Sequence, residues 1–204
     1  MRTPRHVPFV VFLVGVVTIT LALAAPSGAA ARASKKPVTF NKAMSCTAKG
    51  DLVASPALTD TGTKKATMTI HLTLSKCGGK KGRTEHKVTV KSGTLTGTIK
   101  VAHNQCTALL EDIPALHATA RFTGKGGKIA PATITYSGGV ADPEISPVTM
   151  TFPEPKGMVS DRGSFKGRKG SITLKLAEST TEMEGACQTG LSEVKFSSGT
   201  AIFG

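Results

Sequence analysis

The chain has 204 residues, with 26 Lys and Arg against 13 Asp and Glu and a formal net charge of +13. Aromatic residues make up only 4% of it and tryptophan is absent, which disfavours recognition of sugars or single-stranded nucleic acid by ring stacking. The basic balance favours anionic surroundings, although it also serves solubility alone.

The first predicted element is an export signal. Two arginines precede an apolar run over residues 7–25, and small residues follow up to Ala33. This order is typical of a secretory signal peptide. The alternative is an uncleaved membrane anchor, for which ~20 apolar residues suffice. We therefore predict a signal peptide over residues 1–33 and a single secreted domain over residues 34–204, anchored to the membrane if the leader is retained.

Alternation of apolar and polar residues dominates the rest of the chain. In Ala66–Ser75 every even position is apolar and every odd position is polar, which places the apolar side chains on one face of a β-strand. Shorter runs of the same kind predict strands at Val88–Val90, Leu95–Val101, Ala118–Phe122, Ala132–Tyr136, Val148–Phe152, Ile172–Leu176 and Val194–Phe203.

The segments between these runs refine the prediction. The apolar phase switches across Ser92-Gly93, which indicates a β-bulge. Prolines flank Val148–Phe152, which predicts a strand at a sheet edge. No segment keeps an apolar helical period over three turns, and Thr107–Asp112 is the one helical candidate. Together these features predict an all-β fold, a single antiparallel β-sandwich or barrel of about 8–10 strands.

Four cysteines follow the leader, at Cys46, Cys77, Cys106 and Cys187. In an oxidising compartment they form two disulfides, and three pairings are open. A hairpin that turns at Asp60–Thr63 would place Cys46 opposite Cys77, which favours this pair and leaves Cys106 with Cys187. The absence of a C-x-x-C motif argues against a zinc site.

The search for catalytic residues yields weak candidates. Ser192 and Lys195 match an S-x-x-K motif by letter, but the alternating run around them predicts a strand rather than the helix that this motif needs. The other candidates are dispersed histidines and acidic pairs that match no metal-binding pattern. They are His71, His86, His103, His117, Glu111-Asp112, Asp142 with Glu144, and Glu182 with Glu184. We predict no enzymatic activity, no cofactor and no metal.

Basic glycine loops are the best candidate site, because glycine amides and neighbouring cations together form anion-binding nests. Two such loops lie at residues 78–83 and 124–128, and a third basic cluster lies at residues 162–169. The candidate anion-binding residues are Lys80, Lys81, Arg83, Lys125, Lys128, Arg162, Lys166, Arg168 and Lys169. Loops that meet at one end of the sheet would form a basic rim for polyanions, whereas loops at opposite ends would be ordinary turns.

The cysteines also stand in a recognisable arrangement. Cys46 opens a C-x-x-x-G motif, a strand ends in Cys77-Gly78, a Gly-Thr-rich strand leads to Cys106, and Cys187 precedes the last strand. This arrangement resembles that of small, uncharacterised secreted β-rich proteins of actinobacteria. The resemblance implies a disulfide-stapled β fold outside the cytoplasm and no particular activity.

We therefore expect a secreted or envelope-associated, non-enzymatic β-domain. Its expected partner is anionic, such as an envelope polymer or lipid head groups, and no specific nucleic acid is expected. The alternative is a carrier that holds a small apolar, lipid-like ligand inside a closed sheet. Salt distinguishes these hypotheses, because polyanion binding weakens steeply with ionic strength and binding in an apolar pocket does not.

Overall fold

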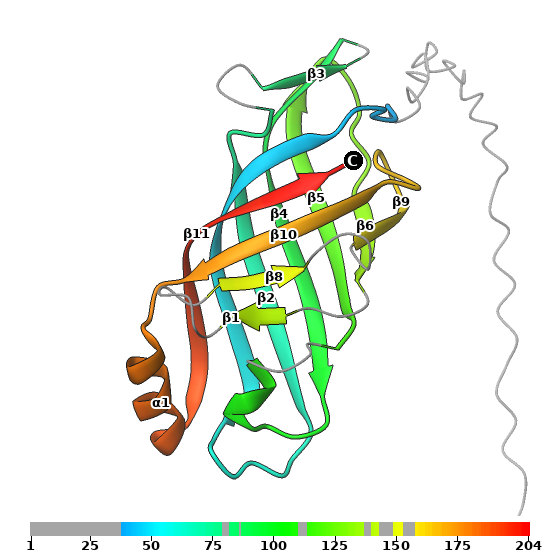
Figure 1. Ribbon diagram of the computed structural model, residues 1–204. Coiled ribbons are helices and arrows are strands. Elements are labelled where there is room, and N and C mark those ends of the chain that lie inside the picture. Colours follow the sequence, from blue (N-terminus) through cyan, green and yellow to red (C-terminus); the bar gives the residue numbers. More distant parts are fainter. Residues whose placement is uncertain are drawn as a thin grey trace, which may run out of the picture. The chain divides into compact units, whose positions relative to one another are not determined.

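Antiparallel strands form most of the described structure (Figure 1). The computed structural model describes residues 38–78, 82–85, 87–109, 114–136, 140–142, 149–152 and 158–204. Residues 35–204 form one compact unit of the chain, which holds the hydrophobic core and both disulfides. No helix in the described ranges is long and apolar enough to cross a membrane.

One sheet contains 11 strands. They are β1 (Met44–Leu58), β2 (Ala66–Ser75), β3 (Arg83–Glu85), β4 (Val88–Val101), β5 (Leu116–Lys125), β6 (Ala132–Tyr136), β7 (Val140–Asp142), β8 (Thr149–Phe152), β9 (Met158–Arg162), β10 (Lys169–Leu176) and β11 (Leu191–Phe203). A 3-10 helix, η1 (Cys106–Leu109), follows β4, and an α-helix, α1 (Thr180–Thr189), connects β10 to β11.

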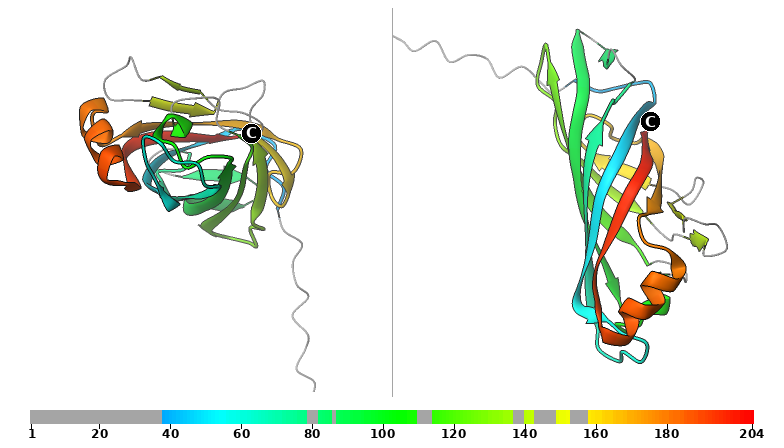
Figure 2. Two further views of the ribbon diagram at one scale, coloured as in Figure 1. Left: turned by 90° about the horizontal axis from the view of Figure 1, so that it is seen from below. Right: turned by 90° about the vertical axis from the view of Figure 1, so that its left-hand side faces the viewer.

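The sheet curls until its two ends meet. Neighbouring strands follow the order β11-β1-β2-β4-β5-β6-β9-β10, and β10 pairs in turn with β11. β8 also pairs with β10, and β7 pairs with β8 at the end of this branch. Figure 2 shows the curled sheet from below, with the branch outside it. The prediction of a single antiparallel all-β fold is confirmed, and one curled sheet rather than two facing sheets forms it.

The alternation in the sequence decides which side of the sheet is inside. In β2 the even residues are buried, and the odd residues are half-buried or exposed. β4 buries the same side of the sheet, because the buried Leu72 of β2 pairs with the buried Leu95 of β4. Each such side chain contributes roughly 1.5–3 kcal/mol when fully buried. The largest side chains that are fully buried are Phe40, Phe152, Phe165, Met44, Leu52, Leu58, Met68, Ile70, Leu74, Leu95 and Ile99.

Strand β4 bends sharply, as the phase switch in its sequence predicts. Its register against β5 shifts between Val90 and Ser92, so the predicted bulge is confirmed. Farther along, a Cβ on Gly97 would lie 2.7 Å from Leu116 Cδ1 and 2.8 Å from the Cβ of Ala118. Glycine at this position therefore lets β4 and β5 approach closely where the sheet curves.

Both disulfides have the favoured pairing. They join Cys46 to Cys77 and Cys106 to Cys187, across sequence separations of 31 and 81 residues. The first bond follows from the β1–β2 hairpin, in which Thr47 pairs with Ser75. After β2 ends, Lys76 adopts a positive φ of 51°, and the next residue, Cys77, is fully buried.

One prediction about local structure is wrong. β8 is not an edge strand, because it lies between β10 and β7, and β7 forms the edge. No proline lies within β8 itself, so its ladder loses no donor. Of the helical candidate Thr107–Asp112, the described residues 107–109 belong to η1, which begins at Cys106; residues 110–113 lie outside the described residues.

Helix α1 is absent from the sequence-based prediction. It buries only Met183 and Cys187, which is too narrow an apolar stripe to be recognised by periodicity. Its start nevertheless carries a signal, because Ser179 and Glu182 form a capping box. Glu182 and Glu184 consequently stand two residues apart on a helix, not on one face of an extended chain.

Candidate functional site

The predicted basic loops meet at one end of the sheet. This end receives the connection from β2 through β3 to β4, the connection from β5 to β6, and the turn from β9 to β10. In an antiparallel sheet, alternate connections lie at the same end, and all three lie at the upper end of Figure 1. We call it the basic end, and it comprises residues 38–42, 76–91, 121–131 and 163–170 as far as they are described.

Backbone and side-chain hydrogen bonds join the second loop to the third. Ser164, a fully buried polar residue, accepts a hydrogen bond from the Ala130 backbone N–H at its Oγ (3.0 Å). The carbonyl of Ser164 accepts another from the Phe40 N–H at 2.8 Å. The Val38 N–H donates to the carbonyl of Lys128 at 3.2 Å. The segment at 38–40 therefore ties the 124–131 loop to the 163–169 turn.

The first loop lies against the second through the β4–β5 ladder. Thr89 pairs with Lys125, and Arg83 of β3 pairs with Val90 of β4. Gly126 has a φ of 92°, and a Cβ there would lie 1.9 Å from the carbonyl oxygen of Lys87. Only glycine allows this approach, which places the backbone of Gly126 against that of Lys87.

Aromatic rings form the floor of the basic end. Phe165 stacks on Phe40, with ring centroids 5.1 Å apart. It also contacts Phe122 at 5.1 Å and Phe203 at 5.7 Å. The rings come from four separate segments, so this cluster holds the loops above it in fixed positions.

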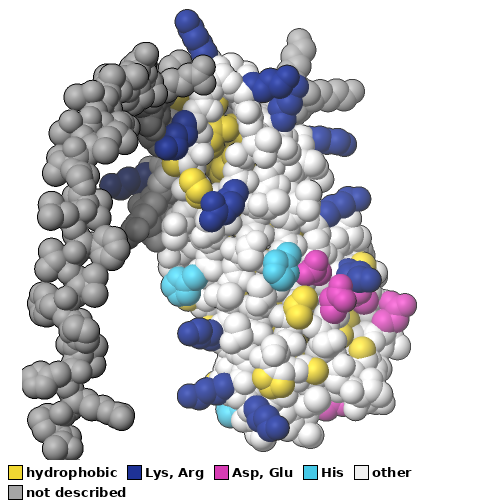
Figure 3. All heavy atoms as spheres, turned by 180° about the vertical axis from the view of Figure 1, so that it is seen from behind, with side chains coloured by type: hydrophobic (Ala, Val, Ile, Leu, Met, Phe, Trp, Pro, Cys, Tyr) yellow, Lys and Arg dark blue, Asp and Glu magenta, His cyan; other side chains and the backbone are white. Residues whose placement is uncertain are grey.

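The described side chains of the basic end are predominantly basic, and Glu85 is placed there, in β3, by its backbone alone. All of the described cations are exposed except Arg168, which is half-buried and donates to the carbonyl of Asn41. Figure 3 shows dark blue Lys and Arg side chains over the upper part of the molecule, whereas the magenta acidic side chains visible on that face lie lower. The described cations are Lys42, Lys76, Lys87, Lys91, Arg121, Lys125, Lys128, Lys166, Arg168 and Lys169.

The structure brings together most of the candidate anion-binding residues. Lys125, Lys128, Lys166 and Lys169 are exposed at the basic end, with Arg168 beside them. Lys80 and Lys81 lie outside the described residues. Arg83 and Arg162 are placed in β3 and β9 by their backbones alone.

Sequence analysis missed other cations of this end. Lys42, Lys76, Lys87 and Lys91 are all exposed there. None of them lies in the basic glycine loops at residues 78–83 and 124–128. Their common signal is that each stands at a strand terminus that points toward the same end, which requires the strand order and direction.

The opposite end of the sheet carries helix α1 and acidic side chains. Asp60, Glu182 and Glu184 are exposed and Glu178 is half-buried. Hydrogen bonds from the Ser179 backbone N–H (2.7 Å) and hydroxyl (2.8 Å) to the Glu182 carboxylate hold the pKa of Glu182 below its usual value. Exposed lysines, among them Lys64 and Lys65, also lie at this end, so its charge is mixed.

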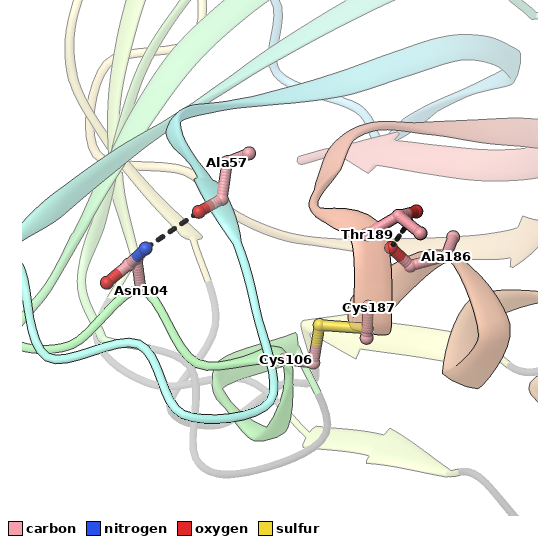
Figure 4. Close-up of a disulfide and its surroundings, with 6 residues drawn as sticks. All are labelled: Ala57, Asn104, Cys106, Ala186, Cys187 and Thr189. Atoms are coloured by element: carbon pink, nitrogen blue, oxygen red, sulfur yellow. Dashed lines mark hydrogen bonds between the residues drawn. A yellow bond between two sulfur atoms is a disulfide. The ribbon is translucent and has the colours of Figure 1, made fainter.

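Asn104 and a disulfide organise this opposite end (Figure 4). The Asn104 side-chain amide donates to the Ala57 carbonyl at 2.7 Å, and its oxygen accepts from the Lys64 N–H at 2.9 Å. Two residues later, Cys106 bonds to Cys187 of α1. The β1–β2 turn, η1 and α1 are thereby linked.

The weak catalytic and metal candidates remain scattered. Ser192 and Lys195 both lie in β11, as the alternating pattern predicts. His71 Nδ1 lies 3.0 Å from Asp51 Oδ1 on the exposed face of the sheet. His103 and His117 are exposed. Glu111-Asp112, His86, Glu144 and the side chain of Asp142 lie outside the described residues.

One cluster of potential metal ligands occurs near α1. Asp60, Cys106 and Cys187 have ligand atoms within 4.8 Å of one another. Both sulfur atoms, however, are bonded to each other in a disulfide. They are therefore not available as thiolates, the form in which cysteine binds zinc.

Cavities among the described residues are small. Four of them have volumes of about 10, 150, 210 and 270 Å³, whereas pockets for drug-sized ligands usually measure roughly 300–1,000 Å³. The 210 Å³ cleft lies beside Met183 and the Cys106–Cys187 bond. None of the four favours the apolar-ligand carrier over the anion-binding hypothesis.

Comparison of the chain with protein-family models, curated proteins and solved structures finds no match. The resemblance to secreted actinobacterial proteins thus stays a prediction. The candidate site is accordingly defined by its own geometry and charge.

Proposed function

We propose that this chain is an exported, non-enzymatic β-domain that binds an anionic partner through its basic end. The observation that carries the proposal is the meeting of three basic loops, distant in sequence, at one end of a curled sheet. The described side chains of that end include many exposed cations. A surface with a large excess of one charge sign attracts anions of the opposite sign.

The arrangement suits an extended or multivalent anion. Exposed lysine ammonium groups keep their water until they meet the anion, and each has three donors on a flexible stem. Gly167, with a φ of 73° and open space where a Cβ would lie, leaves the backbone of the third loop accessible. Such backbone amides add donors to the surrounding cations.

Export is part of this proposal. The two disulfides fit an oxidising compartment, and the leader sequence over residues 1–33 predicts secretion. The resulting location would place the basic end among the anionic polymers and lipids of a cell envelope.

Heparin, a soluble polyanion, tests the proposal. The exported protein is compared with the triple variant Lys125→Gln/Lys128→Gln/Lys166→Gln by titration at low ionic strength. We expect about tenfold weaker binding for the variant, and affinity that falls as salt is added, because binding of a polyanion releases condensed counterions.

A matched variant controls for net charge. Lys64→Gln/Lys65→Gln/Lys100→Gln removes three exposed cations from the opposite end, so it changes the total charge equally. When the titration is repeated at about 0.1 M ionic strength, its heparin affinity should stay within about twofold of the unmodified protein, because these residues then lie beyond a Debye length of roughly 10 Å from the basic loops. Equal losses in both variants, or no heparin binding by the unmodified protein, would overturn the proposal.

A further inference from the structure

Apolar side chains reach the surface between the cations of the basic end. Val38, Phe122 and Ile129 pack against the core but are only half-buried. Ile202, next to the last residue of β11, is 37% exposed and lines the same shallow depression as Arg168 and Lys169. Figure 3 shows yellow hydrophobic side chains among dark blue ones at the upper end.

Two of these residues belong to the segments that join the basic loops. The Val38 N–H donates a backbone hydrogen bond to the Lys128 carbonyl, and Ile129 directly follows Lys128 in the chain. A Cβ on Gly127 would lie 2.7 Å from Val88 Cγ2 and 3.9 Å from Val38 Cγ2. The apolar side chain of Val38 therefore lies beside the loop that carries Lys125 and Lys128.

This combination fits a lipid bilayer better than a soluble polymer. A polyanion needs cations alone, whereas apolar side chains ringed by lysines can enter the headgroup boundary while the lysines pair with lipid phosphates. Long lysine stems also let the ammonium group reach the headgroups while the methylenes stay in the apolar layer.

The distribution of charge would orient the domain on such a surface. Acidic side chains gather at the α1 end, so an anionic bilayer attracts the basic end and repels part of the other.

We propose that the anionic partner is the surface of an anionic phospholipid bilayer, and that Val38 and Ile129 enter its headgroup layer. This inference rests on the proposed function, because it assigns a partner to the same basic end. It adds an apolar contribution that binding of a soluble polyanion does not have.

The probe is a set of vesicles of phosphatidylcholine with or without phosphatidylglycerol. The exported protein should sediment with the anionic vesicles and not with pure phosphatidylcholine. The variant Val38→Ser/Ile129→Ser should bind the anionic vesicles about tenfold more weakly and should elute from heparin at the same salt concentration as the unmodified protein. An unchanged circular dichroism spectrum and melting curve show that the variant has folded. Val53→Ser, at a 38% exposed position of β1, is the control and should change neither result.

A fluorescent reporter gives a signal that appears on membrane contact, so the test does not depend only on a loss of vesicle binding. The chain has no tryptophan, so Thr39→Trp introduces a single one at an exposed position next to Val38. Its emission should shift to shorter wavelength on anionic vesicles. Thr63→Trp, exposed at the opposite end, should show no shift.

The outcomes separate the two proposals. Heparin binding without vesicle binding would overturn the membrane inference and leave the proposed function standing. If the unmodified protein bound neither heparin nor anionic vesicles, the proposed function and the membrane inference would both be overturned. The apolar contact would be overturned if Val38→Ser/Ile129→Ser left vesicle binding unchanged and the Thr39→Trp emission did not shift. Cations alone would then hold the protein on the vesicle.

Discussion

Single residues decide the structure of the end opposite to the basic loops. Asn104 is 7% exposed, and its side chain satisfies the backbone of the β1–β2 region at two points, Ala57 and Lys64. Its own backbone carbonyl accepts from the Thr59 N–H at 2.9 Å. A Cβ on Gly62 would lie 2.1 Å from that carbonyl oxygen, so the turn packs closely against it.

Replacing Asn104 should destabilise the fold. We expect Asn104→Ala to lower the free energy of unfolding by about 1–3 kcal/mol, because a buried donor and acceptor lose their partners. Urea denaturation measures the change. Asn104→Asp keeps the acceptor for Lys64 and should cost less than Asn104→Ala when its carboxyl is neutral; equal stability of the unmodified protein and Asn104→Ala would contradict this role.

Glu182 makes the start of α1 sensitive to pH. Its pKa is lowered first by the hydrogen bond from the Ser179 backbone and then by that from the Ser179 hydroxyl. A group with a depressed pKa in the folded state stabilises that state above the unfolded pKa and ceases to do so as pH falls through the folded pKa. The contribution of the capping box is therefore present at neutral pH and lost below pH 4.5, the usual value for glutamate.

An NMR titration of the Glu182 carboxyl tests this expectation. The measured pKa should lie below 4.5, and in Ser179→Ala it should rise toward that value. Amide exchange in α1 should accelerate as the carboxyl takes up its proton. Glu182→Gln should show no such acceleration over the same pH range, since its amide does not titrate. A carboxyl pKa at or above 4.5 would contradict the capping role.

At the scale of elements, α1 depends on its disulfide. The helix buries two side chains, Met183 and Cys187, so few apolar contacts hold it to the sheet. The Cys106–Cys187 bond supplies a covalent link and closes a loop of 81 residues, compared with 31 for Cys46–Cys77. In the chain-entropy account, the longer loop gives the larger stabilisation.

Removing each disulfide should therefore have a different local effect. Cys106→Ala/Cys187→Ala should cost about 4.5 kcal/mol and Cys46→Ala/Cys77→Ala about 3.7 kcal/mol from loop closure alone. Only the first variant should expose α1 to hydrogen exchange and to proteolysis between β10 and β11. Equal exchange of α1 in the two variants would show that the helix is held by its packing instead.

For the whole molecule, the curled sheet determines where the charges lie. The antiparallel order places the ends of β2 and β5 at the same end of the sheet as the starts of β4 and β10, and an exposed lysine stands at or next to each of these termini. The heparin and vesicle experiments address this scale. They compare equal losses of charge at the two ends, and they compare replacement of apolar residues by serine inside and outside the basic end.

Local patterns predicted individual elements well. The run Ala66–Ser75 matches β2 at both ends, and Ala132–Tyr136 matches β6, because a half-buried strand shows its period in its own residues. Helix α1 was not predicted, because its stability comes from a cap and a disulfide more than from an apolar stripe. The edge position of β7 depends on which strand pairs with β8, and the residues of these two strands do not by themselves reveal that pairing.

The sequence by itself indicated strands such as β2 and β6 and the bulge in β4, and it favoured the β1–β2 hairpin and the disulfide pairing that follows from it, since alternation and turn residues act over a few neighbours. Only the tertiary structure decided that the sheet curls back on itself, that α1 docks through Cys187, and that Lys42 and Lys166 share one end. These outcomes depend on which strands pair and in which direction. Pairing is set by contacts between distant segments, so its result lies in the packed chain rather than in any one stretch of residues.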